Sequence, residues 1–195
     1  MLQASNTNLN IEAYNAVISG LYTKQRNFDV GKSKLIEILE EMSENKIHPN
    51  EQTLMNSIKY IFHLVAKSRD ATSNNATDGE KTVLSLLSEF RSLGIEPSLA
   101  SYEYIIKLYN LSALREKCHS IIFDIIEELE NKQKSGSSLK IIIPEDVNFF
   151  YQAMQWINKL SNVKLAYRTH RLLLNEGENY NSLLGGFDTQ SYYYK

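Results

Sequence analysis

The three prolines of this chain occur in one local pattern that returns at an almost constant spacing. They are Pro49, Pro97 and Pro144, which lie 48 and 47 residues apart. A large apolar residue follows each proline by five positions and opens an amphipathic run: Leu54, Tyr102 and Phe149. A proline that returns at a near-constant spacing, with two helical runs between successive prolines, indicates an array of helical repeats. Such arrays usually offer a surface to long partners rather than a pocket for chemistry.

Apolar residues between the prolines follow the spacing of helices. The first run places Tyr14, Val17, Ile18 and Leu21 at i, i+3, i+4 and i+7, which is one face of a helix. We predict eight such helices, and we find no strand pattern of any length. They cover approximately residues 14–21, 35–42, 54–65, 83–90, 102–109, 122–129, 150–160 and 164–174. The predicted fold class is all-α: an α-solenoid of antiparallel helix pairs.

The ends of several helices can be read from single residues. Asn50 and Ser98 can cap the helices that follow two of the prolines, because their side-chain oxygens accept orphan backbone N–H groups. Gly94 can close the preceding helix in a left-handed conformation. Two polar stretches, residues 67–79 and 131–139, are expected to be insertions between helices, the first of them mobile.

These features predict about four repeats in a continuous array. We expect an N-terminal tail at residues 1–9, repeats within residues 10–176, and a loop at residues 177–195 that leads toward a further helix. The expected repeat units are 12–51, 52–99, 100–146 and 147–176. The chain ends in an aromatic cluster with nothing after it to pack against, so we expect it to be a piece of a longer protein.

Composition and charge narrow the class of protein. The chain has 21 basic and 23 acidic residues and a formal net charge of -2, so it lacks the basic excess of a free-standing nucleic-acid binder. Cys118 is the only cysteine, which excludes an internal disulfide and suits a reducing compartment. No stretch approaches the roughly 20 apolar residues of a membrane span. The first ten residues resemble neither a signal peptide nor a transit peptide, so we expect any targeting signal to lie upstream.

No residues converge on a recognisable catalytic or metal-binding pattern. Residues 31–33 read Gly-Lys-Ser, like the end of a phosphate-binding loop, but the first glycine of that motif would fall at Arg26. Cys118 and His119 are neighbours on a predicted helix and point in different directions, so they cannot hold a zinc ion together. We therefore expect no catalytic, cofactor-binding or metal-binding residues, no cofactor, and no enzyme activity.

Two junctions in the chain resemble one known repeat family. Residues 12–21, EAYNAVISGL, resemble the first helix of a pentatricopeptide repeat, and residues 40–50 resemble the end of its second helix and its exit turn. Residues 93–102 repeat the same junction. The family unit has about 35 residues, and the units here are longer because of the polar insertions. The resemblance implies pentatricopeptide-like helix pairs in a solenoid that binds RNA or protein.

A narrower resemblance covers the second half of the chain. This part of the chain resembles the pentatricopeptide repeat domain-containing protein 3 group. The segments that carry the resemblance are residues 96–102, 122–126, 149–154 and 165–173. Proteins of that group are components of the mitochondrial small ribosomal subunit and are several times longer than this chain. The resemblance implies a structural, RNA-associated role in mitochondrial translation, in the mitochondrial matrix. The implied partners are ribosomal proteins and RNA (rRNA or mRNA), without a membrane or a small-molecule substrate.

In RNA-reading members of the family, one side chain in each first helix pairs with another after the exit proline, and small polar residues there bind one base per repeat. The candidate RNA-facing pairs in this chain are Ala16 with Glu51, Asn56 with Leu99, and Tyr104 with Asp146. None is a usual base-reading pair, since Ala16 and Leu99 have no hydrogen-bonding side chain. Tyr104 and Tyr151 can still contact or stack on RNA.

Two other functions stay open beside the ribosomal one. The first is a free organellar RNA-binding factor in transcript processing, stability or translation, and the missing base-reading pairs count against it. The second is a protein–protein scaffold of the tetratricopeptide kind, and the proline-ended second helices count against that. Because the chain carries no net positive field, we expect only weak, sequence-tolerant binding to single-stranded RNA.

Overall fold

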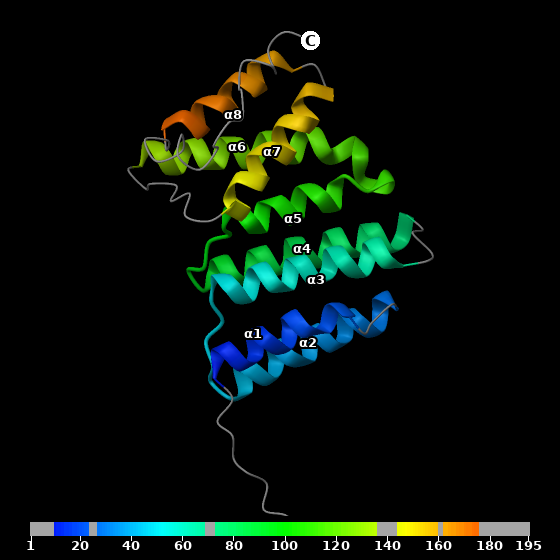
Figure 1. The fold of residues 1–195 in the computed structure, drawn as a ribbon. Helices are drawn as coiled ribbons and strands as arrows, with labels where there is room; N and C mark the ends of the chain where they lie inside the picture. Colours follow the sequence, from blue (N-terminus) through cyan, green and yellow to red (C-terminus); the bar gives the residue numbers. More distant parts are fainter. Residues whose placement is uncertain (1–9, 24–26, 69–72, 136–143, 160–161, 176–195) are drawn as a thin grey trace, which may run out of the picture. The chain divides into compact units, whose positions relative to one another are not determined.

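The computed structural model describes residues 10–23, 27–68, 73–135, 144–159 and 162–175 (Figure 1). All regular structure in these ranges is helical, which confirms the predicted all-α fold class. The elements are α1 (Ile11–Gly20), η1 (Leu21–Thr23), α2 (Phe28–Glu44), α3 (Glu51–Lys67), α4 (Ser73–Ser92), α5 (Leu99–Tyr109), η2 (Ser112–Lys117), α6 (Cys118–Lys134), α7 (Pro144–Lys159) and α8 (Val163–Asn175). Within the described ranges, no helix is both long enough and apolar enough to cross a membrane.

The chain forms two compact units, and each is described by itself. Unit one ends at Cys118 and contains α1 to α5 with the 3-10 turns η1 and η2. Unit two begins at His119 and contains the remainder of α6 with α7 and α8. The predicted pairing of α5 with α6 would join the two units, so it stays a prediction.

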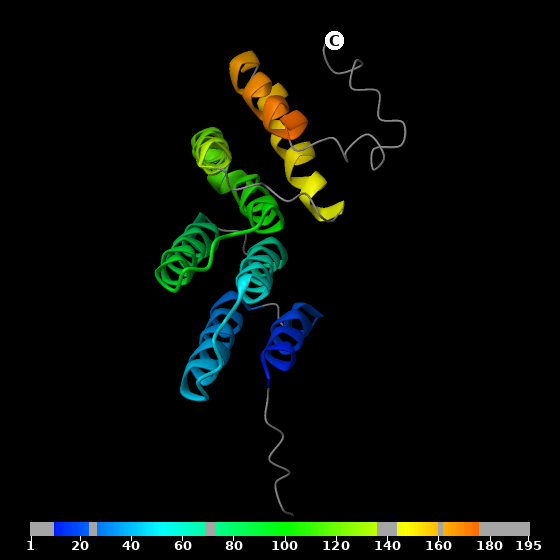
Figure 2. The same ribbon diagram turned by 90° about the vertical axis from the view of Figure 1, so that its left-hand side faces the viewer.

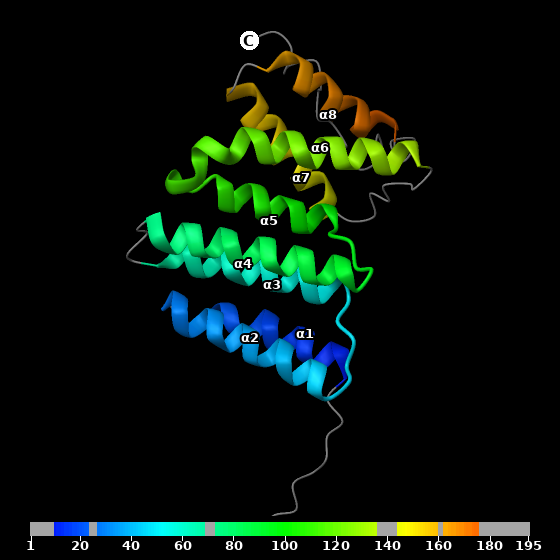
Figure 3. The ribbon, with the colours of Figure 1, turned by 180° about the vertical axis from the view of Figure 1, so that it is seen from behind.

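In unit one the helices form two layers. Figure 2 shows α1, α3 and α5 in one layer and α2 and α4 in the other. The central helix α3 packs against α1, α2, α4 and α5. Figure 1 views the layer of α1 and α3 from outside, and Figure 3 views α2 and α4 from the opposite side. We call the outer surface of α1, η1, α3 and α5 the first-helix face.

The core of unit one follows the apolar stripes read from the sequence. On α3, Leu54, Ile58 and Ile61 are completely buried, and Leu64 is 1% exposed. Burying one such side chain stabilises the fold by roughly 1.5–3 kcal/mol. Because α3 contacts four neighbouring helices, its apolar residues lie on more than one side, and this helix organises the unit.

Helices α2 and α4 end in the same type of turn, which is the structural form of the repeat junction. A residue with left-handed backbone follows each helix: Lys46 with φ 57° and Gly94 with φ 77°. The N–H of the next residue, Ile47 or Ile95, donates to the carbonyl five residues earlier, at 2.8 and 2.9 Å. This Schellman motif satisfies the last carbonyls of the helix. The left-handed closure predicted at Gly94 is confirmed.

Polar side chains cap the N-termini of the helices. Asn50 accepts the backbone N–H of Thr53 at 3.0 Å, and the Thr53 hydroxyl accepts the N–H of Asn50 at 3.2 Å, so the two form a capping box. Ser98 accepts the N–H of Ser101 at 3.3 Å. Both predicted caps are therefore confirmed. Similar side-chain caps are provided by Asn10, Asn27 and Asn162.

The insertion predicted at residues 67–79 is largely wrong, because α4 begins at Ser73. The first turns of α4 pack on α3 through small residues. Ala76 is 3% exposed, and a Cβ placed on Gly79 would lie 2.6 Å from Cγ2 of Val65. Polar composition concealed this contact, since Ala76 and Gly79 lie among polar residues in the sequence. Residues 69–72 lie outside the described part of the chain.

The second predicted insertion, residues 131–139, is also helical in its first part. Helix α6 continues to Lys134, and Lys132 pairs with Glu128 at 2.9 Å one turn earlier. Such pairs support a helix by ~0.2–0.5 kcal/mol. Residues 136–139 lie outside the described ranges, as do the predicted tail at 1–9 and the predicted loop at 177–195. The four repeat boundaries are not tested by these helices and stay a prediction.

In unit two, α7 packs against α8 and an ion pair joins α6 to α8. The guanidinium of Arg168 donates to both carboxylate oxygens of Glu130, at 3.0 and 2.9 Å. Hydrogen bonds from Arg168 lower the pKa of Glu130, so the carboxylate stays ionised. The same guanidinium lies 4.8 Å from the ring centre of Phe123, which extends the contact between the two helices.

Candidate nucleic-acid interface

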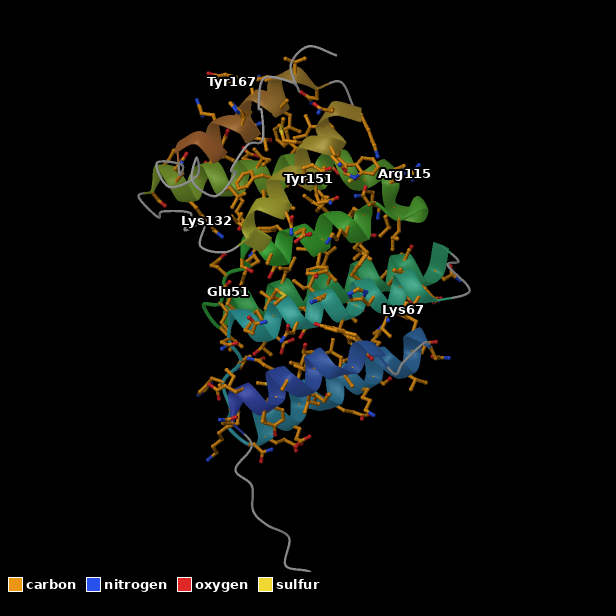
Figure 4. All side chains as sticks on the ribbon, viewed as in Figure 1. Glu51, Lys67, Arg115, Lys132, Tyr151 and Tyr167 are labelled. Atoms are coloured by element: carbon orange, nitrogen blue, oxygen red, sulfur yellow. The ribbon has the colours of Figure 1, made fainter. Side chains whose placement is uncertain are left out.

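The predicted RNA-facing residues of unit one lie in three different environments. Ala16 and Glu51 are exposed, the first on α1 and the second at the start of α3, where Figure 4 labels it. Asn56 and Leu99 are buried, with 5% and 6% of their surface exposed. Tyr104 is half-buried on α5. Among these residues, Tyr104 has an aromatic ring that is partly exposed to solvent and that also contacts other side chains.

The two remaining predicted residues lie on α7 of unit two. Tyr151 is 44% exposed and is labelled in Figure 4. Asp146 lies in the first turn of α7, and its side chain is outside the described part of the chain. None of these positions tests whether the residues contact RNA, so the candidate pairs stay predictions.

Asn56 joins two helices instead of pointing outward. Its Nδ2 donates to the backbone carbonyl of Asn15 on α1 at 3.2 Å, and its Oδ1 accepts from Nε2 of Gln52 at 3.0 Å. A buried amide with both ends hydrogen-bonded stabilises its surroundings, whereas a lost partner would cost roughly 1–3 kcal/mol. The geometry gives Asn56 a role in holding α1 against α3.

A polar network lies beside this contact at the N-terminal part of α1 and α3. Nδ2 of Asn15 donates to Oδ1 of Asn50 at 3.3 Å, and the hydroxyl of Thr53 donates to Oδ1 of Asn15 at 2.8 Å. Asn15 and Asn50 immediately precede Ala16 and Glu51, the first predicted pair. The structure thus brings together the side-chain amides of Asn15 and Asn50, each of which lies one position before a residue of the predicted pair.

A second group of side chains gathers further along the first-helix face, and we call it the aromatic–lysine surface. It comprises half-buried side chains from η1, α3 and α5: Tyr22, Lys59, Phe62, His63, Tyr104 and Lys107. The ring of His63 lies 5.3 Å from that of Tyr22, 5.1 Å from that of Phe62 and 6.3 Å from that of Tyr104, between centres. These rings therefore form a continuous row across three elements.

The lysines of this surface lie over the tyrosine rings. Nζ of Lys59 is 5.1 Å from the ring centre of Tyr22 and 5.5 Å from that of Tyr104. Nζ of Lys107 is 4.8 Å from the ring centre of Tyr104. Cation–π contacts of this length contribute ~0.5–1 kcal/mol when exposed. Lys59 of α3 thus connects a ring of η1 with a ring of α5.

The charge of the aromatic–lysine surface is positive at neutral pH. Burial and the nearby charges of Lys67, Lys59 and Lys107 lower the pKa of His63, so its imidazole is neutral. The ammonium of Lys107 pairs with the buried carboxylate of Glu103 at 2.5 Å, which offsets one positive charge. Lys67, labelled in Figure 4 at the opposite end of α3 from Glu51, donates to the backbone carbonyl of Tyr22 at 2.8 Å. Two lysine charges therefore remain beside the rings.

Sequence reasoning found Tyr104 but missed its neighbours. A usable signal was present in the repeat register. Lys59 and Lys107 both lie five residues after the apolar residue that opens their helix, and Tyr22 and Phe62 both lie eight residues after it. Reading one offset across successive repeats would have placed these residues on one surface before the structure was known.

Other chemistry-bearing residues have structural partners. The phosphate-loop-like Gly31 lies inside α2, where a Cβ would meet the side chain of Leu64, so a close helix contact requires this glycine. Glu80 accepts from the hydroxyl of Tyr109 at 2.8 Å and from Nζ of Lys117 at 2.7 Å. Cys118 is buried. Among the described residues, no three His, Cys, Asp or Glu side chains are grouped to hold a metal ion.

The fold and the recurring exit turn define a helical-repeat protein. The family described as "Pentatricopeptide repeat domain" matches residues 2–62, which confirms the resemblance seen in the sequence. The chain is also similar to "Small ribosomal subunit protein mS39" from several animals. The mouse protein is 32% identical over 188 residues, which cover 94% of this chain and 25% of the mouse protein.

Proteins of the same name from other animals are similar to the chain as well. The Bos taurus protein of the same name is 30% identical over 185 residues, and the Drosophila melanogaster protein is 32% identical over 160 residues, or 82% of this chain. The chain spans about a quarter of the length of the curated relatives it matches. These matches confirm the narrower resemblance as well, since they extend over both halves of the chain.

Proposed function

We propose that this chain is a segment of a non-catalytic solenoid in the small subunit of the mitochondrial ribosome, where it supports mitochondrial translation. The observation that carries the proposal is the similarity to small ribosomal subunit protein mS39 over 94% of the chain at 26–32% identity. The proposed location is the mitochondrial matrix. The proposed partners are proteins and RNA of the small subunit, and the proposed organisation is the four repeats 12–51, 52–99, 100–146 and 147–176.

The physical properties of unit one support a docking role of this kind. In unit one the carboxylates of Glu80 and Glu103 pair with Lys117 and Lys107, and the whole chain has a net charge of only -2. A protein without a strong field gains little from non-specific RNA attraction, which is dominated by phosphate neutralisation. Repeat arrays instead assemble through many modest contacts along their length.

Sedimentation of the full-length protein tests this proposal. We expect the protein in mitochondrial extracts to migrate with the small ribosomal subunit in a density gradient. Deleting residues 100–146 removes a whole predicted repeat, so this variant should lose the association. The exposed substitution Lys81→Gln is the matched control, because its side chain is 72% exposed on α4 and pairs only weakly with Asp78 at 3.7 Å. Full-length protein that migrates free of ribosomes at low salt would contradict the proposal.

A second candidate function is favoured by one observation, the aromatic–lysine surface. The aromatic–lysine surface is suited to an unpaired nucleic-acid strand, so a free organellar RNA-binding factor is the alternative. That alternative predicts ribosome-free protein bound to particular transcripts. The same gradient fractions, examined for their RNA content, distinguish the two functions.

A further inference from the structure

We propose that the outer surface of α6 and α8 in unit two docks an acidic amphipathic helix of a partner protein. We call it the α8 ridge surface, and it comprises six side chains: Phe123, Val163, Lys164, Tyr167, Arg168 and Arg171. None of them is among the candidate RNA-facing residues. The inference goes beyond the proposed function, because it is drawn from the residues of these two helices alone.

The apolar part of this surface is a row of exposed side chains on α8. Val163 and Tyr167 are 80% and 64% exposed, more than any other large hydrophobic residue in the described ranges, and Figure 4 labels Tyr167. Arg171 follows four residues after Tyr167, so the three side chains form one ridge with a spacing of four. Such ridges pack into the grooves between ridges of another helix. The row therefore suits a helix that presents apolar residues at the same spacing.

The charges of α8 specify an acidic partner. The helix carries Lys164, Arg168 and Arg171 and contains no Asp or Glu from Val163 to Asn175. Lys164 is exposed and lies one turn before Tyr167, and Arg171 lies one turn after it. Nη2 of Arg171 is 3.8 Å from Oε1 of Glu130, beyond hydrogen-bond length, and its side chain is 53% exposed. Cations therefore stand on both sides of the tyrosine ring, where carboxylates of a docked helix can pair with them.

Contacts between α6 and α8 hold the edge of this surface in place. Arg168 donates to both carboxylate oxygens of Glu130, and its guanidinium lies 4.8 Å from the ring centre of Phe123. Phe123 is itself 38% exposed on α6. In Figure 3 the two helices lie next to each other in unit two. A surface whose side chains are already ordered loses little conformational entropy when a partner binds.

A nucleic-acid strand is one competing occupant, and the charges of α6 count against it. The exposed carboxylate of Glu127 lies one turn after Phe123 on α6, and the carboxylate of Glu130 lies between the two arginines of α8. A chain of phosphates needs a continuous run of cations, and these acidic groups interrupt it. An amphipathic helix needs only two or three carboxylates at fixed positions.

A later repeat of the same protein is the other competing occupant. Within unit one, α3 packs against its neighbours through completely buried apolar side chains such as Leu54, Ile58 and Ile61. A contact of that kind on the α8 ridge surface would remove Lys164 and Arg171 from water, which is costly unless each charge gains a partner. An acidic helix provides those partners, so it fits the surface better than an apolar repeat contact.

Site-specific photo-crosslinking identifies the occupant. The crosslinking amino acid benzoylphenylalanine replaces Tyr167 in the full-length protein, which is irradiated in intact cells, and mass spectrometry identifies the attached molecule. We expect a peptide of another protein that is acidic and has apolar residues four positions apart. The same substitution at Leu84 is the control, because Leu84 is a 47% exposed apolar residue on α4. It should not capture this peptide.

Binding of the identified peptide, made synthetically, to the full 195-residue chain then tests each part of the surface. Tyr167→Gln should weaken binding at least about 10-fold, as expected for a central tyrosine of an interface. Arg171→Glu should also weaken binding, and a peptide with lysine in place of the facing glutamate should restore it. Tyr167→Phe and Arg171→Lys keep the ring and the charge, so both should bind like the parent chain. Because both positions are exposed, the thermal midpoints should not change.

Four outcomes would overturn the inference. They are crosslinks to nucleic acid or to no protein at all, crosslinks to a later segment of the same protein, capture of a basic segment, and affinities that Tyr167→Gln and Arg171→Glu leave unchanged. The second outcome would make the α8 ridge surface a contact within the repeat array. The proposed ribosomal function is judged separately by sedimentation, which does not depend on what α8 binds.

Discussion

Gly31 of α2 lies directly against Leu64 of α3, so close that a Cβ at position 31 would be 2.5 Å from Cδ2 of Leu64. Leu64 is 1% exposed and cannot rotate out of the core. The two helices belong to successive predicted repeats. Because Gly31 has no side chain, α2 and α3 can pack this closely.

The contact predicts that Gly31→Ala destabilises unit one although alanine favours a helix. The gain in helix propensity is about 1 kcal/mol, and overpacking a core costs typically 1–3 kcal/mol. We therefore expect a net loss of about 0–2 kcal/mol in the free energy of unfolding, measured by chemical denaturation. Gly20→Ala is the matched control, because no heavy atom lies within 4 Å of a Cβ there. A Gly31→Ala variant more stable than Gly20→Ala would show that α2 and α3 pack less closely.

A second prediction concerns the hydroxyl of Tyr60. Tyr60 is fully buried, and within the described part of the chain its hydroxyl has no hydrogen-bond partner. Burial raises the pKa of this phenol, which keeps it neutral. A buried unsatisfied group costs roughly 1–3 kcal/mol, so Tyr60→Phe should leave stability unchanged or raise it. The hydroxyl also lies 2.9 Å from a Cβ at position 31, and Tyr60→Phe should therefore reduce the loss caused by Gly31→Ala. Purely additive effects in a double-mutant cycle would contradict this contact.

The equivalent exit turns of α2 and α4 predict opposite effects at equivalent positions. Lys46 has a left-handed backbone, which costs an L-residue with a side chain roughly 1 kcal/mol. Lys46→Gly should therefore stabilise unit one by about that amount. Gly94→Ala should destabilise it by a similar amount, because the space around Gly94 is open and only its φ of 77° opposes a side chain. Thermal melts of the two variants check both signs, and shifts in the same direction would refute the account of the turns.

The environment of His63 predicts a dependence of stability on pH. Its folded-state pKa is lowered from 6.5 by burial and by Lys67, Lys59 and Lys107, so the unfolded chain binds the proton first as pH falls. The contribution of His63 to stability is thus complete above pH 6.5 and decreases as pH falls through the lowered folded-state value. Its neighbours from the packed elements are the lysines of α3 and α5 with the rings of Tyr22 and Tyr104.

The variant His63→Gln tests this, because glutamine does not titrate. Its free energy of unfolding should fall less steeply below pH 6.5 than that of the parent chain. His48→Gln is the control, since His48 is exposed. Parallel pH profiles for the parent and His63→Gln would mean that the imidazole is not held among positive charges.

Much of this fold could be predicted from the sequence because its information is local. The stripe of Tyr14 and Ile18, the caps at Asn50 and Ser98 and the closure at Gly94 each depend on residues a few positions apart. The start of α4 could not be predicted in this way. It depends on the burial of Ala76 and on the close approach of Gly79 to Val65 of α3, and their polar neighbours resemble a loop.

In the candidate interface, too, features that depend on nearby residues could be predicted and contacts between separate elements could not. Tyr104 was recognised from its place in the repeat, whereas its contacts with His63 and Lys59 join residues 41 and 45 positions away. No periodicity within one helix encodes such contacts. Asn56 was assigned to the face by its register, but only the fold reveals that its amide is used between α1 and α3.

Photo-crosslinking of the intact mitochondrial small ribosomal subunit, followed by mass spectrometry of RNA-bound peptides, tests the account most directly. The account predicts that peptides of this chain are present in the subunit fraction, with nucleotides attached to the first-helix face at Tyr22 or Tyr104. Lys59→Gln should reduce the yield of these crosslinks while the protein stays in the fraction. Absence of the protein from the subunit, or crosslinks confined to α2 and α4, would contradict it.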